Sequence, residues 1–253
     1  MKAGAATPSS PLIAVTTAQS EIIDGTLHLP AQWSPTAVVG ALVRAGATPI
    51  LAPIGVSPAG AAQVISSADG LLLTGGNDVA LFGAPHRAHF QDPQRDHSDL
   101  LYLRQARQRG IPVLGICRGM QLLVASAGGT LCAVPGHLSQ GRACPSRHSI
   151  SVVAGSRLAT ALGVQTTDVN SLHRYAVATC GQHVAVAHAV DDVIEAVEHP
   201  DRWELGVQWH PELEGLPQSH RLWRSFVEAA AQRQDTRAQV RPKLRTRPGT
   251  MRA

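Results

Sequence analysis

The chain has 253 residues, of which 44% are hydrophobic and 16% are charged. This length corresponds to one large domain or two small ones, and the apolar content can bury a core, which excludes a mostly disordered protein. The net charge of +4 arises at the end of the chain, because residues from Arg233 onward include seven basic residues and one acidic residue.

Several classes of protein are excluded by the same composition. No apolar segment approaches the ~20 residues of a membrane span, and Pro8 and Pro11 interrupt the N-terminal segment before a signal peptide can form. Four cysteines without a C-x-x-C pair predict a reducing compartment and hence a cytoplasmic protein. Without its basic end the chain is slightly acidic, so we expect no nucleic-acid surface on the core and no membrane partner.

Short apolar runs alternate with helical segments through the first half of the chain. In chain order, the pattern predicts a strand at 12–15, a helix at 34–46, a strand at 49–52, a helix at 58–68, a strand at 70–74, a loop over 77–97, a helix at 98–109, a strand at 111–116 and a helix at 118–127. Such alternation predicts an α/β fold with a parallel sheet covered by helices on both faces.

The second half is richer in strands, which predicts an antiparallel extension of the sheet. Strands are predicted at about 148–153, 183–190, 193–198 and 203–209, followed by a helix at 218–232. We therefore expect a flexible segment at 1–10, a single domain over 11–232 and a basic, disordered tail at 233–253.

A candidate nucleophile lies where a buried strand runs into a helix. The segment Gly115-Ile116-Cys117-Arg118-Gly119 has the G-x-C-x-G pattern of a nucleophile elbow, with Cys in place of Ser. At a helix N-terminus, free N–H groups and the helix dipole favour the thiolate of Cys117. The alternative is a buried, inert cysteine, which is how we interpret Cys132, Cys144 and Cys180.

A base and an orienting group for this cysteine are found near the end of the last predicted strand. His210 and Glu212 are two residues apart, so both side chains lie on one side of an extended chain. Pro211 between them favours that extended conformation. His-Pro-Glu is a weak signal by itself, but together with Cys117 it predicts a Cys-His-Glu triad.

Stabilisation of an oxyanion requires two backbone N–H groups. The N–H of Arg118, directly after the nucleophile, is one candidate. The segment 74–78, with Gly75-Gly76, can supply the other, because glycine permits the dihedral angles that point an N–H inward; its alternative is a plain turn. The other histidines, including His137 and His148, match no zinc-ligand spacing, so no metal site is predicted.

These motifs together resemble the class I glutamine amidotransferase superfamily, and within it the gamma-glutamyl peptidase branch. The resemblance covers roughly residues 12–230 and rests on the segments 71–79, 115–123, 128–131, 169–173 and 205–212. It implies a flavodoxin-like parallel sheet, no cofactor, the triad Cys117, His210 and Glu212, and Gly76 and Arg118 as oxyanion-hole donors. It also implies that Gln121, Ser171, Leu172 and His173 bind the glutamyl part of the substrate.

The activity that this resemblance implies is hydrolysis of the amide bond of a small gamma-glutamyl amine, such as gamma-glutamyl-gamma-aminobutyrate, through a glutamyl thioester. Two alternatives stay open: a glutaminase subunit that supplies ammonia to a separate synthase, and a non-catalytic binding domain on the same fold. The sequence does not identify the amine, and it leaves the oligomeric state open, including a homo-oligomer.

Overall fold

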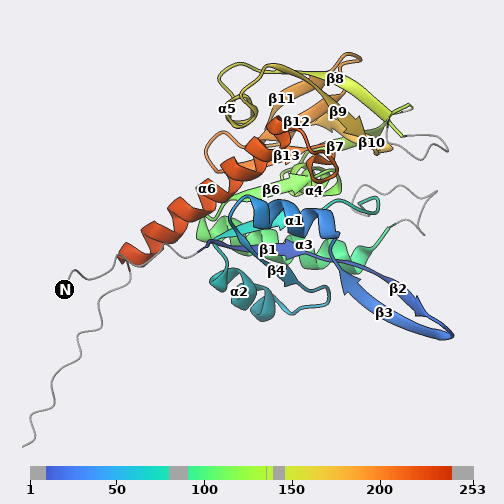
Figure 1. Ribbon diagram of the computed structural model, residues 1–253, viewed down its shortest axis with the longest axis vertical. Coiled ribbons are helices and arrows are strands. Elements are labelled where there is room, and N and C mark those ends of the chain that lie inside the picture. Colours follow the sequence, from blue (N-terminus) through green and yellow to red (C-terminus); the bar gives the residue numbers. More distant parts are fainter. Residues whose placement is uncertain (1–9, 80–90, 135, 139–145, 241–253) are drawn as a thin grey trace, which may run out of the picture.

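The computed structural model describes residues 10–79, 91–134, 136–138 and 146–240 (Figure 1). Its centre is a mixed sheet whose parallel half has the strand order β4-β1-β5-β6-β13. These strands are β1 (Leu12–Thr16), β4 (Thr48–Ala52), β5 (Gly70–Leu73), β6 (Val113–Ile116) and β13 (Glu204–Val207). The carboxyl ends of these parallel strands all lie at one edge of the sheet.

An antiparallel half continues the sheet beyond β13. It follows the order β12 (Ile194–Glu198), β11 (Val184–Ala189), β8 (Ser146–Val152) and β9 (Thr166–Ser171), while β10 (Tyr175–Thr179) pairs with both β12 and β7 (Thr130–Ala133). This strand-rich half forms the upper part of the molecule in Figure 1. The predicted fold class, a parallel sheet with an antiparallel extension, is confirmed.

Helices cover both faces of the parallel half, and alternate residues of its strands point to opposite faces. Ile13 and Val15 belong to a core shared with α1 (Thr36–Arg44) and α6 (Pro217–Val240). Ala14 belongs to the opposite core, which it shares with α2 (Pro58–Ser67), α3 (Pro93–Arg109) and α4 (Arg118–Ala125). The strands are therefore buried on both faces, as their continuous apolar runs predict.

Two helices are longer than predicted. Helix α3 begins at Pro93 instead of 98, because the Asp92 side chain caps it by accepting a hydrogen bond from the Arg95 N–H and proline is well tolerated at the first helical position. The predicted loop over 77–97 is therefore wrong over its last five residues. Helix α6 continues to Val240, eight residues beyond the predicted end at 232. Residues 1–9 and 241–253, Cys144 and the loop segment 80–90 lie outside the described residues.

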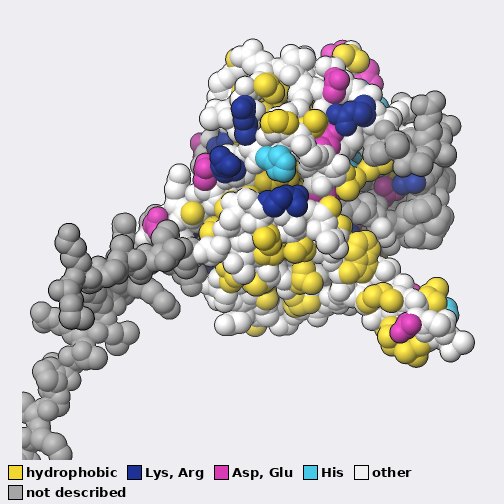
Figure 2. All heavy atoms as spheres, in the orientation of Figure 1, with side chains coloured by type: hydrophobic (Ala, Val, Ile, Leu, Met, Phe, Trp, Pro, Cys, Tyr) yellow, Lys and Arg dark blue, Asp and Glu magenta, His cyan; other side chains and the backbone are white. Residues whose placement is uncertain are grey.

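Several elements were not predicted: the hairpin of β2 (Ala18–Asp24) and β3 (Leu27–Trp33), the strands β7, β9 and β10, and the short helix α5 (Arg157–Leu162). The hairpin projects from the body of the protein (Figure 1). It carries exposed apolar side chains, including Ile22, Ile23 and Leu27, and Figure 2 shows hydrophobic side chains at the surface of this projection. In the described part of the chain, no helix has the length and apolarity to span a membrane.

Candidate active site

The candidate site residues follow three neighbouring parallel strands. Leu73 at the end of β5 is in register with Gly115 of β6, and Ile116 of β6 is in register with Val207 of β13. The segments that follow these strands therefore meet at the carboxyl edge of the sheet, which is where open α/β sheets bind ligands. They contain Gly75-Gly76, Cys117 and His210, respectively.

Cys117 lies on a strained turn between β6 and α4. Its dihedral angles are φ 50° and ψ −103°, a conformation that L-residues rarely adopt, and its N–H donates to the Val207 carbonyl over 2.7 Å. The turn is tight because a side chain at Gly119 would collide with the Leu73 carbonyl. This geometry is the predicted elbow, and it leaves the Cys117 side chain 5% exposed at the N-terminus of α4.

His210 lies between Cys117 and Glu212. Its Nδ1 is 2.7 Å from Glu212 Oε1. Burial acts to lower the pKa of His210, but the charge of Cys117, hydrogen bonding to Cys117 and the Glu212 carboxylate outweigh it, so the pKa lies well above its usual value. The structure thus brings together the three residues predicted as a triad, with His210 in contact with both of its partners.

The backbone of His210 is fixed by Asn170 of β9. The Asn170 side chain accepts a hydrogen bond from the His210 N–H at 2.9 Å and donates one to the His210 carbonyl at 2.8 Å. Such a two-point contact holds the residue at the end of β13 in one position. Asn170 is therefore a positioning residue for His210.

The Gly75-Gly76 loop lies against His210 and is held by Arg95 of α3. A Cβ atom at Gly75 would come within 2.6 Å of His210 Cε1, and Gly76 has φ 144°. The buried Arg95 guanidinium donates to the Gly75 carbonyl and to Thr74 Oγ1, each over 2.8 Å. Because Arg95 binds the Gly75 carbonyl and the Thr74 hydroxyl on one side of the loop, the loop has a fixed backbone orientation, which an oxyanion hole requires.

Arg95 and Arg118 form a buried charged cluster with two acids of α3. Arg118 pairs with Asp96 and, at 2.6 Å, with Asp99; Arg95 Nε is 3.7 Å from Asp99. Burial and the neighbouring Arg118 lower the pKa of Arg95 to about 10. All four side chains are at most 3% exposed. The cluster links the loop after β5 to the residue that follows the nucleophile.

The predicted substrate-binding residues occupy two different places. Gln121 is buried on α4 and donates to the Tyr175 carbonyl at 2.9 Å and to Gln208 Oε1 at 3.3 Å. Gln208 in turn donates to Cys117 Sγ over 3.5 Å. Gln121 is therefore connected to the sulfur atom through the side chain of Gln208.

Ser171, Leu172 and His173 form the second group, at the end of β9 and directly after it. Leu172 forms a bridge with Leu138, and the Ser171 hydroxyl donates to the His137 carbonyl. His173 Nε2 is 3.4 Å from Glu195 Oε1. Substrate binding by these three residues stays a prediction.

Sequence reasoning did not single out Asn170, Gln208, Arg95, Asp96 or Asp99 as functional residues. Asn170 and Gln208 lie within the segments 169–173 and 205–212. A hydrogen bond from such a side chain to a backbone group or to a sulfur atom cannot be predicted from the spacing of residues along the sequence. The last three carry the Arg-Asp-x-x-Asp pattern at 95–99, in which the acids at i+1 and i+4 could have indicated a buried ion-pair network once the helix was extended to Pro93.

A cavity of about 450 Å³ opens between the hairpin and the candidate site. Its lining includes Trp33 of β3, Val38 of α1, Leu213, Gly76 and His210. This volume is within the range of small-molecule sites. The hairpin therefore contributes the apolar side chains of Ala18 and Trp33 and the polar side chains of Gln19 and Ser20 to the wall of this cavity.

The chain matches a known protein family over most of its length. The family model described as Peptidase C26 matches residues 11–212. A Mycobacterium tuberculosis protein named "Putative glutamine amidotransferase Rv2859c" is 35% identical over 250 residues, covering 93% of this chain and 80% of the relative. The gamma-glutamyl-gamma-aminobutyrate hydrolase of Escherichia coli K12 is 32% identical over 196 residues, covering 69% of this chain and 76% of the relative.

A solved structure supports the fold. The crystal structure described as that of a "putative gmp synthase subunit a protein" from Thermoplasma acidophilum has a TM-score of 0.64 at 16% identity, covering 90% of this chain and 98% of that one. At this identity the likeness establishes the class I glutamine amidotransferase fold alone.

Proposed function

Because this chain belongs to the Peptidase C26 family of class I glutamine amidotransferase-like hydrolases, we propose that it cleaves the amide bond of a small gamma-glutamyl amine, releasing glutamate and the free amine. The observation that carries the proposal is the placement of Cys117 on a strained elbow beside the His210–Glu212 pair. The relatives that are named gamma-glutamyl-gamma-aminobutyrate hydrolases support the same bond specificity.

In the first half of the proposed reaction, the Cys117 thiolate attacks the gamma-carbonyl carbon of the substrate. Negative charge develops on the carbonyl oxygen and is stabilised by the backbone N–H groups of Gly76 and Arg118. His210 then donates its proton to the amine nitrogen as the carbon–nitrogen bond breaks. The free amine leaves, and the glutamyl group is bound to Cys117 as a thioester.

In the second half, water replaces the amine. The now neutral His210 accepts a proton from water as the water oxygen attacks the thioester carbon, and the same N–H groups stabilise the second oxyanion. Breaking the carbon–sulfur bond releases glutamate and restores the thiolate and the imidazolium. Glu212 orients the His210 ring throughout.

The cavity beside His210 supports a small leaving group with an apolar portion. Trp33, Val38 and Leu213 provide apolar contacts, and the cavity reaches Gly76 and His210. An amine that leaves from the proposed tetrahedral intermediate has to lie on the His210 side, because His210 protonates it. We therefore assign this cavity to the amine.

The proposed function is tested by glutamate release from a panel of substrates. The panel contains gamma-glutamyl-gamma-aminobutyrate, other gamma-glutamyl amines, a gamma-glutamyl anilide and glutamine, and alpha-glutamyl-gamma-aminobutyrate is the matched control. We expect release from at least one gamma-glutamyl amine and none from the alpha isomer. Release from glutamine alone would instead assign a glutaminase, and no release from any substrate would contradict the proposal.

Replacing Glu212 with glutamine tests the orienting group. We expect kcat/KM for the best gamma-glutamyl amine to fall by roughly 10²–10⁴-fold, because the His210 ring loses its carboxylate partner. Glu212 also raises the pKa of His210, so its loss lowers that pKa and the imidazolium acid is lost at lower pH. The alkaline limb of the pH–rate profile should therefore move to lower pH. An unchanged profile would contradict this role of Glu212.

A further inference from the structure

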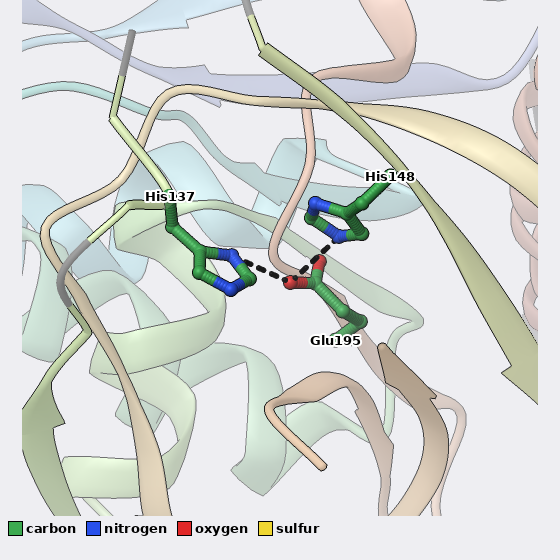
Figure 3. A group of neighbouring side chains, drawn as sticks. All are labelled: His137, His148 and Glu195. Carbon is green, nitrogen blue, oxygen red and sulfur yellow. Dashed lines mark ion pairs between the residues drawn. The ribbon is translucent and has the colours of Figure 1, made fainter. Parts of the chain in front are cut away.

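A second cluster of chemically active side chains lies in the strand-rich half of the protein. It consists of His137, His148, His173 and Glu195, which we call the histidine–glutamate cluster. His148 comes from β8 and Glu195 from β12, while His137 follows β7 and His173 lies between β9 and β10. Figure 3 shows the rings of His137 and His148 directed at the Glu195 carboxylate.

Three ring nitrogens surround one carboxylate oxygen. Glu195 Oε1 is 3.6 Å from His137 Nδ1, 3.2 Å from His148 Nε2 and 3.4 Å from His173 Nε2. Glu195 is 0% exposed. Within the described residues, neither oxygen of Glu195 has a hydrogen-bond partner, and neither do the facing Nε2 atoms of His148 and His173. Such orphaned buried polar atoms indicate a missing partner.

Hydrogen bonds on the side of each ring away from Glu195 determine which ring nitrogen faces the carboxylate. His173 Nδ1 is 3.1 Å from the Tyr175 carbonyl, which only accepts, so Nδ1 carries a proton and Nε2 is the nitrogen that faces the carboxylate. His137 Nε2 is 2.9 Å from Asp191 Oδ2, which leaves His137 Nδ1 on the inner side. The inner nitrogens therefore face a carboxylate oxygen, and a bound metal ion would satisfy both.

His137, His148 and Glu195 lie close enough together to bind one metal ion. Bonds of 2.0–2.2 Å to nitrogen and oxygen place neighbouring ligand atoms of a tetrahedron about 3.3–3.5 Å apart. Glu195 Oε1 lies near this distance from His137 Nδ1 and from His148 Nε2, and the ligand atoms of the three residues all lie within 4.8 Å of one another. Two imidazoles and one carboxylate suit Zn²⁺ and related first-row metals, whereas Mg²⁺ and Ca²⁺ prefer oxygen ligands. We infer that His137, His148 and Glu195 bind a divalent transition metal, with Zn²⁺ as the best fit.

Asp191–His137 is a carboxylate–histidine pair, which is the contact by which metal sites commonly orient a histidine ligand. The alternative is that a protonated histidine ring supplies the positive charge beside Glu195, since the contact with Glu195 raises the pKa of His148. The spacing of the histidines along the sequence predicts no metal site, because the four residues of the cluster come from four separate segments of the chain.

The inferred metal site adjoins the candidate active site. The Glu195 carbonyl accepts a hydrogen bond from the Gln208 N–H at 2.8 Å, and the Gln208 side chain contacts Cys117 Sγ. The Tyr175 carbonyl is shared by His173 and Gln121. A metal here would tie together the segments that support Gln208 and Gln121, so we assign it a structural role. The inference does not depend on the proposed activity.

The test measures metal binding on the full, untagged chain that carries Cys117→Ser, so that the active-site thiolate cannot bind the metal. Chelator-treated protein is titrated with Zn²⁺ against a chromophoric competitor, and with Co²⁺ while the visible spectrum is recorded. We expect one equivalent per chain, a tetrahedral Co²⁺ spectrum and a rise in Tm of roughly 5–10 °C at about 100-fold excess over Kd.

Three variants assign the binding to this cluster. His148→Gln should abolish the Co²⁺ spectrum. Asp191→Asn, at a half-exposed side chain whose loss should not unfold the protein, should weaken Zn²⁺ binding by about 10–100-fold. His183→Gln is the matched control, because His183 is a buried histidine beside Glu204 outside the cluster, and it should bind like the parent. Less than one equivalent bound at micromolar Zn²⁺, or equal affinity in all variants, would overturn the inference.

Discussion

Replacing Cys117 with alanine is expected to reduce hydrolysis of gamma-glutamyl amides by about 10⁴-fold or more while leaving the protein folded. The thiolate is the only proposed nucleophile, and water has no equivalent position on the elbow. Alanine tolerates φ 50° about as well as cysteine does, and the removed sulfur makes one hydrogen bond, to Gln208, beyond its contact with His210. Steady-state glutamate release and far-UV circular dichroism measure the two expectations.

A matched cysteine variant separates the nucleophile from general effects of thiol loss. Cys180 is half-buried, and burial raises the pKa of its thiol, which makes it a poor nucleophile. Cys180→Ala should therefore retain near-parental activity. Substantial activity in Cys117→Ala would contradict the proposed mechanism. Loss of activity in Cys180→Ala with an intact fold would show that the assay does not isolate Cys117.

The geometry around Cys117 could be predicted from sequence because local chemistry determines it. A buried strand, the flanking glycines and a helix start within a few residues leave little freedom for the elbow at Cys117. His210 and Glu212 likewise depend on one short segment after β13, although residues Pro211–Leu213 of it form a 3₁₀ turn, η3, where the sequence predicted an extended chain. Motifs of this kind carry their own geometry, so the structure brings the three side chains together as predicted.

Features built by long-range contacts could not be predicted in the same way. The hairpin of β2 and β3 is mostly exposed and therefore lacks a continuous apolar run, although its Trp33 lines the cavity. The histidine–glutamate cluster joins His137 to Glu195 across 58 residues of sequence, and spacing rules cover only neighbouring ligands. Both features depend on the tertiary arrangement and not on a local pattern.

The buried charges beside the Gly75-Gly76 loop have the largest expected effect on stability. Burial acts to lower the pKa of Arg118, but Asp99 and Asp96 outweigh it and raise that pKa, so the guanidinium stays charged inside the protein. Asp99 contacts both arginines of the cluster, at 2.6 Å to Arg118 and 3.7 Å to Arg95. If this carboxylate is removed, two buried positive charges face each other with Asp96 as the remaining acid of the cluster.

Replacing Asp99 with alanine is therefore expected to lower the free energy of unfolding by about 3–5 kcal/mol, as measured by urea denaturation. The control is Glu21→Ala, which breaks an exposed pair with His28 and should leave stability nearly unchanged. In the fraction of the variant that stays folded, Arg95 and Arg118 lose the carboxylate that both contact, so the proposed oxyanion donors Gly76 and Arg118 are held less firmly. We expect kcat to fall more than KM rises, because oxyanion stabilisation acts mainly in the transition state. A stability loss no larger than that of Glu21→Ala would show that the Asp99 charge is not needed to hold the two arginines.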